Sequence, residues 1–325
     1  GAGHSVVGFD TNSDVISSLK ISGDFKGTTD AALIGDAEAV VIAVPTPLDS
    51  ERKPDLSAVH EACKTIIKNV KKPLLVINES TSYPGTIRGF INPLIEKLSA
   101  GKVEHLYAIS PERVDPGRVE WNQKNTPRLF SGLTPEATRR TREFYSTFCD
   151  QLVEVSSPEV AEAAKLFENT FRQVNIALVN ELVPIAKSLN IDIFEVISAA
   201  ASKPYGFMAF YPGVGVGGHC IPVDPMYLSW AAKKLGKESK LIDIAQEIND
   251  KMPEYVARRV INLNLAATSK VLIVGLSYKS GIADLRESPS VELFELLQFK
   301  IENLEWWDEK ILEWKGKLRS ELKEK

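Results

Sequence analysis

The residues with the clearest chemical potential surround Cys220. A glycine-rich stretch, 213–218, precedes this cysteine, and Asp224 follows it between two prolines. Glycine lets a backbone approach a ligand closely and present its N–H groups. A cysteine beside such donors, or beside a cation, is favoured as the thiolate nucleophile. A lone cysteine is more often a small buried hydrophobe, but this setting favours catalysis at Cys220, with Asp224 orienting a water or a base.

Two further groups of residues can act on a polar substrate. Lys165 and Asn169 are four residues apart, so a helix places both on one face. A lysine in so apolar a helix needs a partner or a ligand, unless that face is simply a solvated edge. Tyr278, Lys279 and Arg286 lie in a loop where the two cations can hold an anion; a solvated charged loop is the alternative.

Polar residues also follow several predicted strands. Asp10 ends the strand 5–9, where an acid accepts hydrogen bonds from the adenosine ribose of a dinucleotide. No arginine for a 2′-phosphate follows it, which favours NAD over NADP. Three later strand ends carry short motifs that are typical of a ligand-binding edge, although each alone is compatible with turn chemistry: Val44-Pro45-Thr46-Pro47, Glu79-Ser80-Thr81-Ser82 and Ser110-Pro111-Glu112-Arg113.

Alternating elements must position these residues. Apolar runs at 5–9, 39–44, 74–77, 106–109, 129–131 and 152–155 alternate with helical patterns, including 135–148. Continuous apolar strands between amphipathic helices predict a doubly wound parallel α/β domain, covered on both faces.

The pattern then becomes helical. Ser157, Pro158 and Glu159 form a strong helix start, and we expect a helix to about residue 189, kinked or ended by Pro184. Further helices are expected at 193–201 and, as one long helix, from 224 to 261. The α/β pattern returns with a strand at 271–275, a helix at 290–297 and a strand at 301–307.

The sequence therefore predicts two Rossmann-like doubly wound α/β domains joined by an all-helical segment. The expected boundaries are 1–156 for an NAD-binding domain, 157–264 for a central catalytic and dimerisation domain, and 265–325 for a C-terminal α/β domain. The glycine-rich phosphate turn of a Rossmann unit does not occur here, because Gly1-Ala2-Gly3 neither follows a strand nor opens a helix. We expect the first strand, this turn and part of the last domain to lie outside the sequence.

Composition narrows the class of protein. The formal net charge of −4 and the mixed charges lack the basic stripe of a nucleic-acid binder. No apolar run approaches the roughly 20 residues of a membrane span. Three scattered cysteines predict a reducing cytoplasmic setting rather than a disulfide framework, and we expect Cys63 and Cys149 to be buried within helices. One histidine beside one cysteine, His219 and Cys220, does not indicate a metal site, so no metal is expected.

Taken in order, the motifs resemble the UDP-glucose/GDP-mannose dehydrogenase family over nearly the whole chain. The resemblance is carried by Asp10 and by six segments: VPTP at 44–47, EST at 79–81, SPER at 110–113, KLFEN at 165–169, GVGVGGHCIPVDP at 213–225 and YKSGIADLRESPS at 278–290. The GGHCIPVDP form is similar to the branch that acts on UDP-N-acetyl-hexosamines, such as UDP-N-acetylmannosamine and UDP-N-acetylglucosamine.

The resemblance implies oxidation of a sugar C6 alcohol to a carboxylate with two NAD in succession. Lys165 and Asn169 would assist deprotonation, Cys220 would form a thiohemiacetal and then a thioester, and Asp224, Glu112 and Thr81 would position the hydrolytic water. The cofactor would contact Asp10, Val44, Pro45, Thr46, Ser80, Thr81 and Arg286. The UDP-sugar would contact Glu112, Arg113, Lys165, Asn169, Tyr211, Gly213, Gly215, Gly217, Tyr278 and Lys279. The resemblance also implies that 265–325 is the UDP-sugar-binding domain, and that a homodimer or higher oligomer forms through the central helices.

Three alternatives remain open from the sequence. A UDP-glucose 6-dehydrogenase shares these motifs, and a β-hydroxyacid dehydrogenase combines a similar first domain with a helical second one but needs no cysteine. A non-catalytic nucleotide-sugar-binding protein would keep the binding residues alone. The joint presence of Lys165, Asn169, Cys220 and Asp224 argues against the last.

Overall fold

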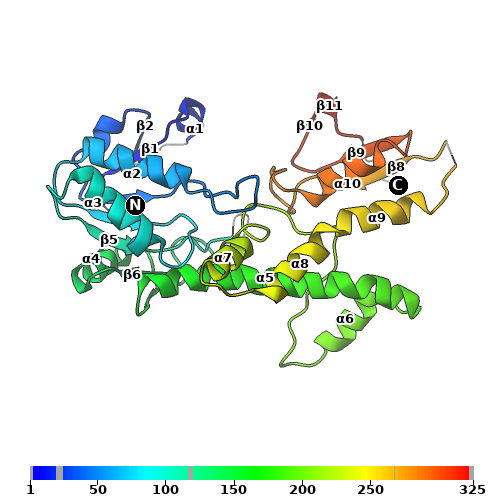
Figure 1. Cartoon of the computed structure of the whole chain (residues 1–325). Helices are drawn as coiled ribbons and strands as arrows, with labels where there is room; N and C mark the ends of the chain where they lie inside the picture. The colour runs from blue at the N-terminus through cyan, green and yellow to red at the C-terminus, as the bar shows by residue number, and fades with distance from the viewer. Residues whose placement is uncertain (1–2, 20–24, 116–119, 267, 322–325) are drawn as a thin grey trace. The chain divides into compact units, whose positions relative to one another are not determined.

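The structure, a computed structural model, describes residues 3–19, 25–115, 120–266 and 268–321. It forms two compact units, Gly1–Leu166 and Phe167–Lys325, which are drawn in Figure 1. The boundary between the units falls inside the long helix α5 (Pro158–Ser188). The finer division into three domains stays a prediction.

The first unit is built on a five-stranded sheet in the order β3-β4-β5-β6-β7. All neighbours in this sheet are parallel except β5 and β6, which are antiparallel. The expected runs are strands, but the expectation of a wholly parallel sheet was wrong at this pair. The strands are β3 (Ala39–Ile42), β4 (Leu75–Asn78), β5 (Leu106–Ile109), β6 (Arg128–Gly132) and β7 (Leu152–Glu154).

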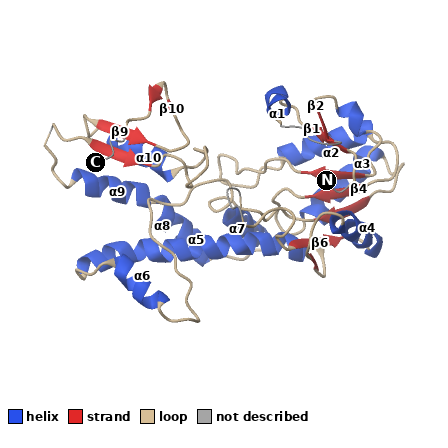
Figure 2. Cartoon of the chain, turned by 180° about the vertical axis from the view of Figure 1, so that it is seen from behind, coloured by secondary structure: helices blue, strands red, loops and turns tan. Residues whose placement is uncertain are grey.

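Helices cover both faces of this sheet, as predicted (Figures 1 and 2). On one face α2 (Ser57–Asn69) and α3 (Asn92–Ser99) bury a large aliphatic cluster against the strands. On the other face α4 (Pro135–Ser146) buries Tyr145 against the central strands. In α2 the buried residues Val59, Cys63 and Ile66 recur at helical spacing, which is what turns that face toward the core. The Rossmann-like α/β fold is confirmed.

A separate two-stranded parallel sheet joins β1 (Val6–Phe9) to β2 (Phe25–Thr28). Between them Asn12 caps the short helix α1 (Ser13–Ser18) by accepting a hydrogen bond from the backbone N–H of Asp14. The sequence analysis did not predict β2, whose four residues Phe-Lys-Gly-Thr carry little apolar signal.

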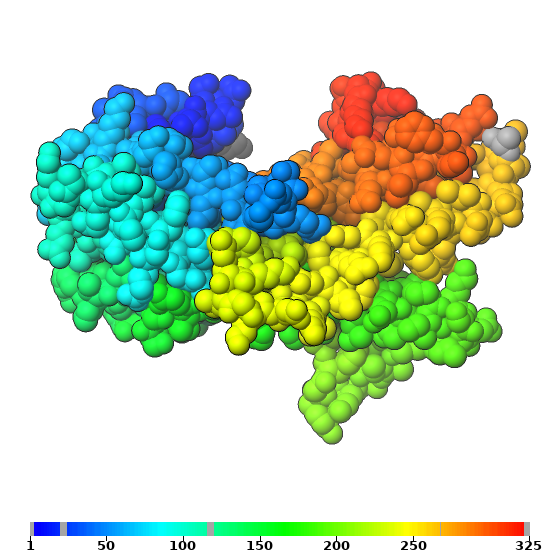
Figure 3. Space-filling view, viewed as in Figure 1, coloured from blue at the N-terminus to red at the C-terminus, as the bar shows by residue number. Residues whose placement is uncertain are grey.

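Helix α5 (Pro158–Ser188) has 31 residues and begins where the sequence predicts. It does not end at Pro184, because the four residues after this proline stay helical. Helix α6 (Ile193–Ala201) begins at the capping residue Asp192 and buries Ile193 and Ile197 against α5. In Figure 3, α6 and its flanking loops stand out from the rest of the second unit.

The long helix expected from 224 to 261 is three helices, so that prediction was wrong. They are α7 (Asp224–Lys234), α8 (Lys240–Asp250) and α9 (Met252–Ile261). Gly236 has a φ of +67° just after α7, a left-handed conformation that ends a helix. Pro253 stands in the first turn of α9, the place where a proline's missing N–H removes no helical hydrogen bond.

The second unit ends in a small α/β layer. Strands β8 (Val271–Val274) and β9 (Leu304–Trp307) are parallel, and α10 (Pro289–Leu297) follows between them in the chain. A cluster around Leu276, Phe294 and Trp306 joins these strands to α10 and α9. The charged tail adds a short hairpin of β10 (Glu313–Trp314) and β11 (Lys317–Leu318). No helix in the described part of the chain has the length and apolar character that spanning a bilayer requires.

Buried Glu162 anchors the segment that follows β4 in the first unit. Its carboxylate accepts hydrogen bonds from the Ser82 hydroxyl at 3.2 Å and from the backbone N–H of Ile87 at 3.1 Å, and also from the N–H of Gly85. The π-helical turn η2 (Ile87–Ile91) begins at this anchor. Burial raises the pKa of Glu162 to about 7, although these hydrogen bonds act in the opposite direction.

This raised pKa predicts a pH-dependent stability. The folded chain holds a proton on Glu162 up to about pH 7, whereas the unfolded chain releases it near pH 4.5. The free energy of unfolding should therefore fall as pH rises from 4.5 to 7, by up to about 3 kcal/mol from this group. Glu162→Gln should remove most of this slope in urea titrations at several pH values.

A neighbouring carboxylate provides the control. Glu159 is ion-paired with Arg88, whose hydrogen bond lowers the pKa of Glu159. Glu159→Gln should therefore leave the slope between pH 5 and 7 in place. A slope in Glu162→Gln equal to that of the unchanged protein would show that Glu162 is already ionised in the fold.

Candidate active site

Cys220 differs from the other two cysteines in its exposure. Cys63 and Cys149 are buried and Cys220 is exposed, and all three are free thiols. Burial raises the pKa of Cys63 to about 12 and also raises that of Cys149, so neither is suited to act as a thiolate. Cys149 follows α4 rather than lying within a helix, which corrects one detail of the sequence analysis.

The turn that holds Cys220 is joined to α5. The carbonyl of Cys220 accepts hydrogen bonds from the backbone N–H groups of Val223 at 3.2 Å and Asp224 at 2.8 Å, so the turn leads directly into α7. The side chain of Asp224 is 1% exposed. Its carboxylate accepts a hydrogen bond of 2.7 Å from the amide of Asn169 on α5. Lys165 stands one turn earlier on the same helix and is half-buried.

The glycine loop has no space for side chains at two positions. A Cβ on Gly217 would lie 2.6 Å from the carbonyl oxygen of Glu287, and a Cβ on Gly218 would lie 2.5 Å from the Tyr278 ring. Gly218 also has a φ of +87°. These contacts bring together the two segments 213–225 and 278–290, which are far apart in the sequence.

Charged side chains of the second segment surround this contact. The N–H of Gly218 donates to the carbonyl of Arg286 at 3.2 Å, and the Arg286 guanidinium is paired with Asp284 at 2.6 Å. The hydrogen bond to Asp284 is the main cause that raises the pKa of Arg286, and the thiolate charge of Cys220 adds to it. Lys279 is half-buried in the same loop.

A row of buried amides supports the start of the glycine loop. The N–H of Gly213 donates to the amide oxygen of Asn180 on α5 at 2.9 Å, and Asn180 donates to Asn249 on α8 at 2.9 Å. Asn249 in turn donates to the carbonyl of Gln173 at 3.2 Å. The sequence analysis missed these residues, because an amide on a helix gives no sign of whether it faces the core. Tyr211, before the loop, is exposed and stacks on Phe194.

The strand ends of the first unit form the expected edge. The Ser80 hydroxyl accepts from the N–H of Val44 at 2.8 Å and donates to its carbonyl at 2.7 Å, which ties the ends of β3 and β4 together. At these strand ends Thr46 is buried, Thr81 is half-buried and Pro45 is exposed. These contacts bring the VPTP and EST motifs side by side.

Asp10 meets the requirement for a ribose ligand. It follows β1, its N–H donates to the carbonyl of Thr28 at 3.1 Å, and its Oδ1 accepts from the N–H of Asn12 at 2.8 Å. Within the described residues, Oδ2 has no hydrogen-bond donor. An acid with an available oxygen at this strand end is what the adenosine ribose of NAD requires. The residues present therefore fit this cofactor.

Arg128 links the second and third strand-end motifs. Its guanidinium is 6% exposed and forms an ion pair with Glu79, and it lies 3.5 Å from the carboxylate of Glu112. It also donates to the Ser110 hydroxyl at 2.8 Å, and its Cζ lies 4.3 Å from the centre of the Tyr145 ring. The only sign of Arg128 in the sequence is a charged residue at the start of an apolar strand, and its place among the strand-end motifs was not predicted.

Glu112 is held as a carboxylate by this network. Burial would raise its pKa, but hydrogen bonds from Gln123 and from the N–H of Val114, with the charge of Arg128, hold the pKa below its ordinary value. At neutral pH Glu112 is therefore a hydrogen-bond acceptor and not a proton donor. The Arg113 guanidinium donates to the carbonyl of Pro127 at 2.8 Å, which keeps this side chain against the same loop.

The predicted site residues thus fall into two groups, one in each unit. The first unit brings together the strand-end residues and carries Lys165 near its boundary. The second unit brings together Asn169, the glycine loop, Cys220, Asp224 and the segment 278–290. The roles assigned to individual residues in each group stay predictions.

Removal of the Arg128 charge should destabilise the first unit. Arg128→Met leaves Glu79 and Glu112 without their buried cation, and breaking a buried ion pair typically costs roughly 3–5 kcal/mol. Urea unfolding would measure the loss. Arg142→Met is the matched control, because Arg142 pairs with Glu154 at the surface, and its loss should be much smaller.

A second substitution separates charge from packing. In Arg128→Met combined with Glu79→Gln, one unpaired carboxylate is gone, so part of the lost stability should return. If the double variant is no more stable than Arg128→Met, the ion pair does not account for the loss.

The chain is similar to known proteins over most of its length. Residues 10–149 match the NAD binding domain of the UDP-glucose/GDP-mannose dehydrogenase family, and residues 159–251 match its central domain. A UDP-N-acetyl-D-glucosamine 6-dehydrogenase of Pseudomonas aeruginosa is 36% identical over 93% of this chain and 77% of that protein. The UDP-D-ManNAc dehydrogenase structure from Pyrococcus horikoshii is 32% identical, with a TM-score of 0.85 over 94% of this chain and 78% of that one. The UDP-N-acetyl-mannosamine dehydrogenase Cap5O from Staphylococcus aureus is 33% identical, with a TM-score of 0.80 over 94% and 76%. The chain therefore belongs to the UDP-glucose/GDP-mannose dehydrogenase family, as its motifs predict.

Proposed function

We propose that this protein oxidises the C6 alcohol of a UDP-N-acetyl-hexosamine to the carboxylate, with NAD as the oxidant. The observation that carries the proposal is an exposed Cys220 whose turn is tied through buried Asp224 to Asn169 of α5. Relatives over most of the chain are named UDP-N-acetyl-D-glucosamine 6-dehydrogenase and UDP-N-acetyl-D-mannosamine dehydrogenase. A purely binding protein would need neither the exposed thiol nor this tether.

The proposed reaction has two oxidation steps, each with one hydride transfer. NAD, when bound, accepts one hydride from the sugar C6 in each oxidation. In the first, Lys165 and Asn169 with an ordered water take up the alcohol proton and stabilise the developing oxyanion. The product of this step is the C6 aldehyde. Asn169 suits this role because Asp224 fixes the orientation of its amide.

The second oxidation passes through Cys220. The thiolate adds to the aldehyde carbon and, with uptake of a proton on the oxygen, forms a thiohemiacetal. Loss of a hydride from that carbon to the oxidant and of the hydroxyl proton then leaves a thioester. Water then cleaves the carbon–sulfur bond, which gives the carboxylate and restores the thiol. Asp224, Thr81 and Glu112 are the residues proposed to orient this water. The covalent bond explains how a reactive aldehyde is retained between the two oxidations.

Other proposed contacts follow the chemistry of each group. The backbone N–H groups at Gly213, Gly215 and Gly217 with Tyr211, Tyr278 and Lys279 suit the nucleotide sugar. Asp10 suits the ribose of NAD. Thr46 and Ser80, which follow β3 and β4, suit other parts of the same cofactor. Three free cysteines, one of them catalytic, favour the reducing cytoplasm as the location.

Substitution of Cys220 tests the covalent step. The full-length protein should release two NADH for each UDP-sugar consumed. Cys220→Ala removes the nucleophile, so kcat should fall by roughly a thousandfold or more, with at most one NADH per sugar. Cys63→Ala, which removes a thiol from the core of the first unit, should keep the ratio of two.

The same assay tests the substrate. Turnover should be highest with UDP-N-acetyl-glucosamine or UDP-N-acetyl-mannosamine in a panel that includes UDP-N-acetyl-galactosamine and UDP-glucose. A release of one NADH per sugar by the unchanged protein would exclude the thioester, and highest turnover with UDP-glucose would overturn the substrate assignment.

We also propose a homodimer through α5 and α6. Leu178 and Ile185 are exposed and lie on one face of α5, since they are seven residues apart. Leu189, directly after α5, and Phe194 on α6 are also exposed. Contiguous exposed apolar surface of this kind typically marks a protein interface. The unpartnered face supports the predicted central-helix interface.

Sedimentation measurements test this interface. Leu178→Asp with Ile185→Asp should convert a dimer to a monomer, because burial of two carboxylates opposes association. Leu241→Asp, on an exposed position of α8, should leave the dimer intact. A chain that is monomeric without any substitution would contradict the proposal.

A further inference from the structure

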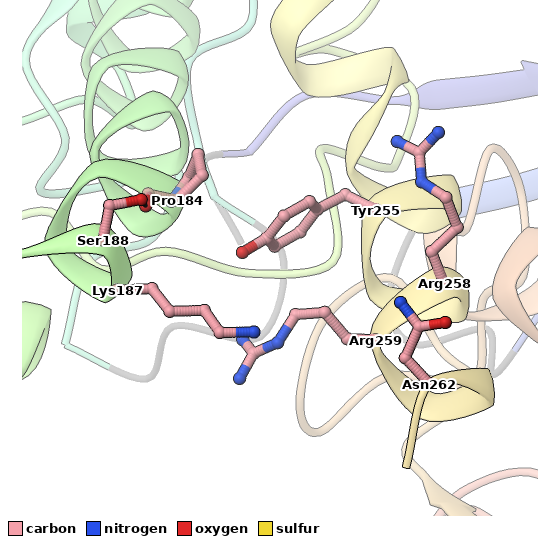
Figure 4. Close-up of a pocket in the computed structure, with 7 residues that line it drawn as sticks. All are labelled: Pro184, Lys187, Ser188, Tyr255, Arg258, Arg259 and Asn262. Atoms are coloured by element: carbon pink, nitrogen blue, oxygen red, sulfur yellow. Dashed lines mark hydrogen bonds between the residues drawn. The ribbon is translucent and has the colours of Figure 1, made fainter. Parts of the chain in front are cut away.

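A cavity of about 470 Å³ lies within the second unit, between the last part of α5 and α9 (Figure 4). Its polar lining comes from two α5 residues and from α9 and the residue after it: Lys187, Ser188, Tyr255, Arg258, Arg259 and Asn262. None of these belongs to the motifs assigned to dehydrogenation. At 1.5 Å per residue along α5, Lys187 is roughly 27 Å from Asn169, so the cavity is remote from the Cys220 turn.

The cavity concentrates positive charge. Three of its lining residues are cations and none is a carboxylate, although the whole chain has a formal net charge of −4. In Figure 4 the side chains of Lys187 and Arg259 point toward each other from the two helices. Such an approach of like charges is unfavourable unless an anion lies between them.

Nearby acids do not neutralise this charge. Glu254 lies 3.4 Å from Arg258, and both side chains are more than half exposed, so this pair is weak and open to exchange. In the part of the chain that the structure describes, neither Lys187 nor Arg259 forms an ion pair. Two of the three cations are therefore available to a ligand.

The remaining groups suit a phosphate ester. Arginine forms paired hydrogen bonds to phosphate oxygens, and the Ser188 and Tyr255 hydroxyls with the Asn262 amide add neutral donors. The Tyr255 ring lies 5.9 Å from the Arg259 guanidinium carbon, so an aromatic face adjoins the cations. The volume falls within the range of small-molecule sites and exceeds what one inorganic phosphate needs.

We propose that this cavity is a second ligand site that binds a phosphate-bearing small molecule of about mononucleotide size. Lys187 and Arg259 neutralise the phosphate from opposite sides, and Tyr255 contacts the organic part. The site is separate from the proposed dehydrogenation, so its test does not depend on that function.

Calorimetric titration of the full-length protein with pyrophosphate and with ADP, at low salt, tests the site. The pocket variant combines Lys187→Gln with Arg259→Gln. It should lose one class of pyrophosphate and ADP sites or bind there at least about tenfold more weakly, while dehydrogenase turnover and unfolding midpoint stay unchanged. Higher salt should weaken the same binding in the unchanged protein.

A charge-matched control separates a built site from general surface charge. Lys237→Gln with Lys240→Gln removes the same two charges from exposed positions near α8 and should titrate like the unchanged protein. Tyr255→Leu should weaken ADP more than pyrophosphate. Equal titrations of all variants, or equal weakening in pocket and control variants, would overturn the proposal.

Discussion

A single buried hydrogen bond organises the reactive part of the second unit. Asp224 is almost completely buried, and a buried carboxylate is costly unless donors satisfy it. The amide of Asn169 is such a donor at 2.7 Å, so the start of α7 is held against α5. The carbonyl of Cys220 accepts a hydrogen bond from the N–H of Asp224, so the position of Asp224 also fixes the position of Cys220. The tight contact of Gly217 and Gly218 with Tyr278 and Glu287 restrains the turn from its other side. Cys220 is thus exposed on a turn that is held from two sides, which suits the nucleophilic role proposed for it.

The first unit is also held by a buried charged side chain, which is a cation here and not a carboxylate. Arg128 is buried among Glu79, Glu112 and Tyr145, and it holds two strand-end motifs in one arrangement. The EST motif therefore has a structural role, because Glu79 pairs with Arg128 and Ser80 joins the ends of β3 and β4. Asp10 is different, since one of its carboxylate oxygens is unused within the described residues. In this unit the edge available to a ligand is thus shaped by groups that a ligand need not touch.

Local charge in the second unit differs from the charge of the chain as a whole. Arg286 and Lys279 lie in the segment packed on the glycine loop, and Arg286 is close enough to Cys220 for their charges to interact. Lys187, Arg258 and Arg259 gather in another place, between α5 and α9. A net charge of −4 reveals neither group, because it is a sum over all charged residues of the chain. These local groups of cations result from the packing of helices and loops and cannot be read from composition.

The sequence by itself determined the family, the α/β character of both ends, the start of α5 and the choice of Cys220 among three cysteines. These depend on local features, such as apolar runs, a helix-capping serine and a glycine loop, that act within a few residues of chain. Only the tertiary structure decided the antiparallel pairing of β5 with β6, the division of residues 224–261 into three helices, and the burial of Arg128, Asn180 and Glu162. The strand pairing and the buried side chains depend on partners far away in the sequence, whereas the helix breaks follow from Gly236 and Pro253 within the segment itself. A strand's direction is set by which edge it meets, and a polar side chain enters the core only where distant donors and acceptors satisfy it.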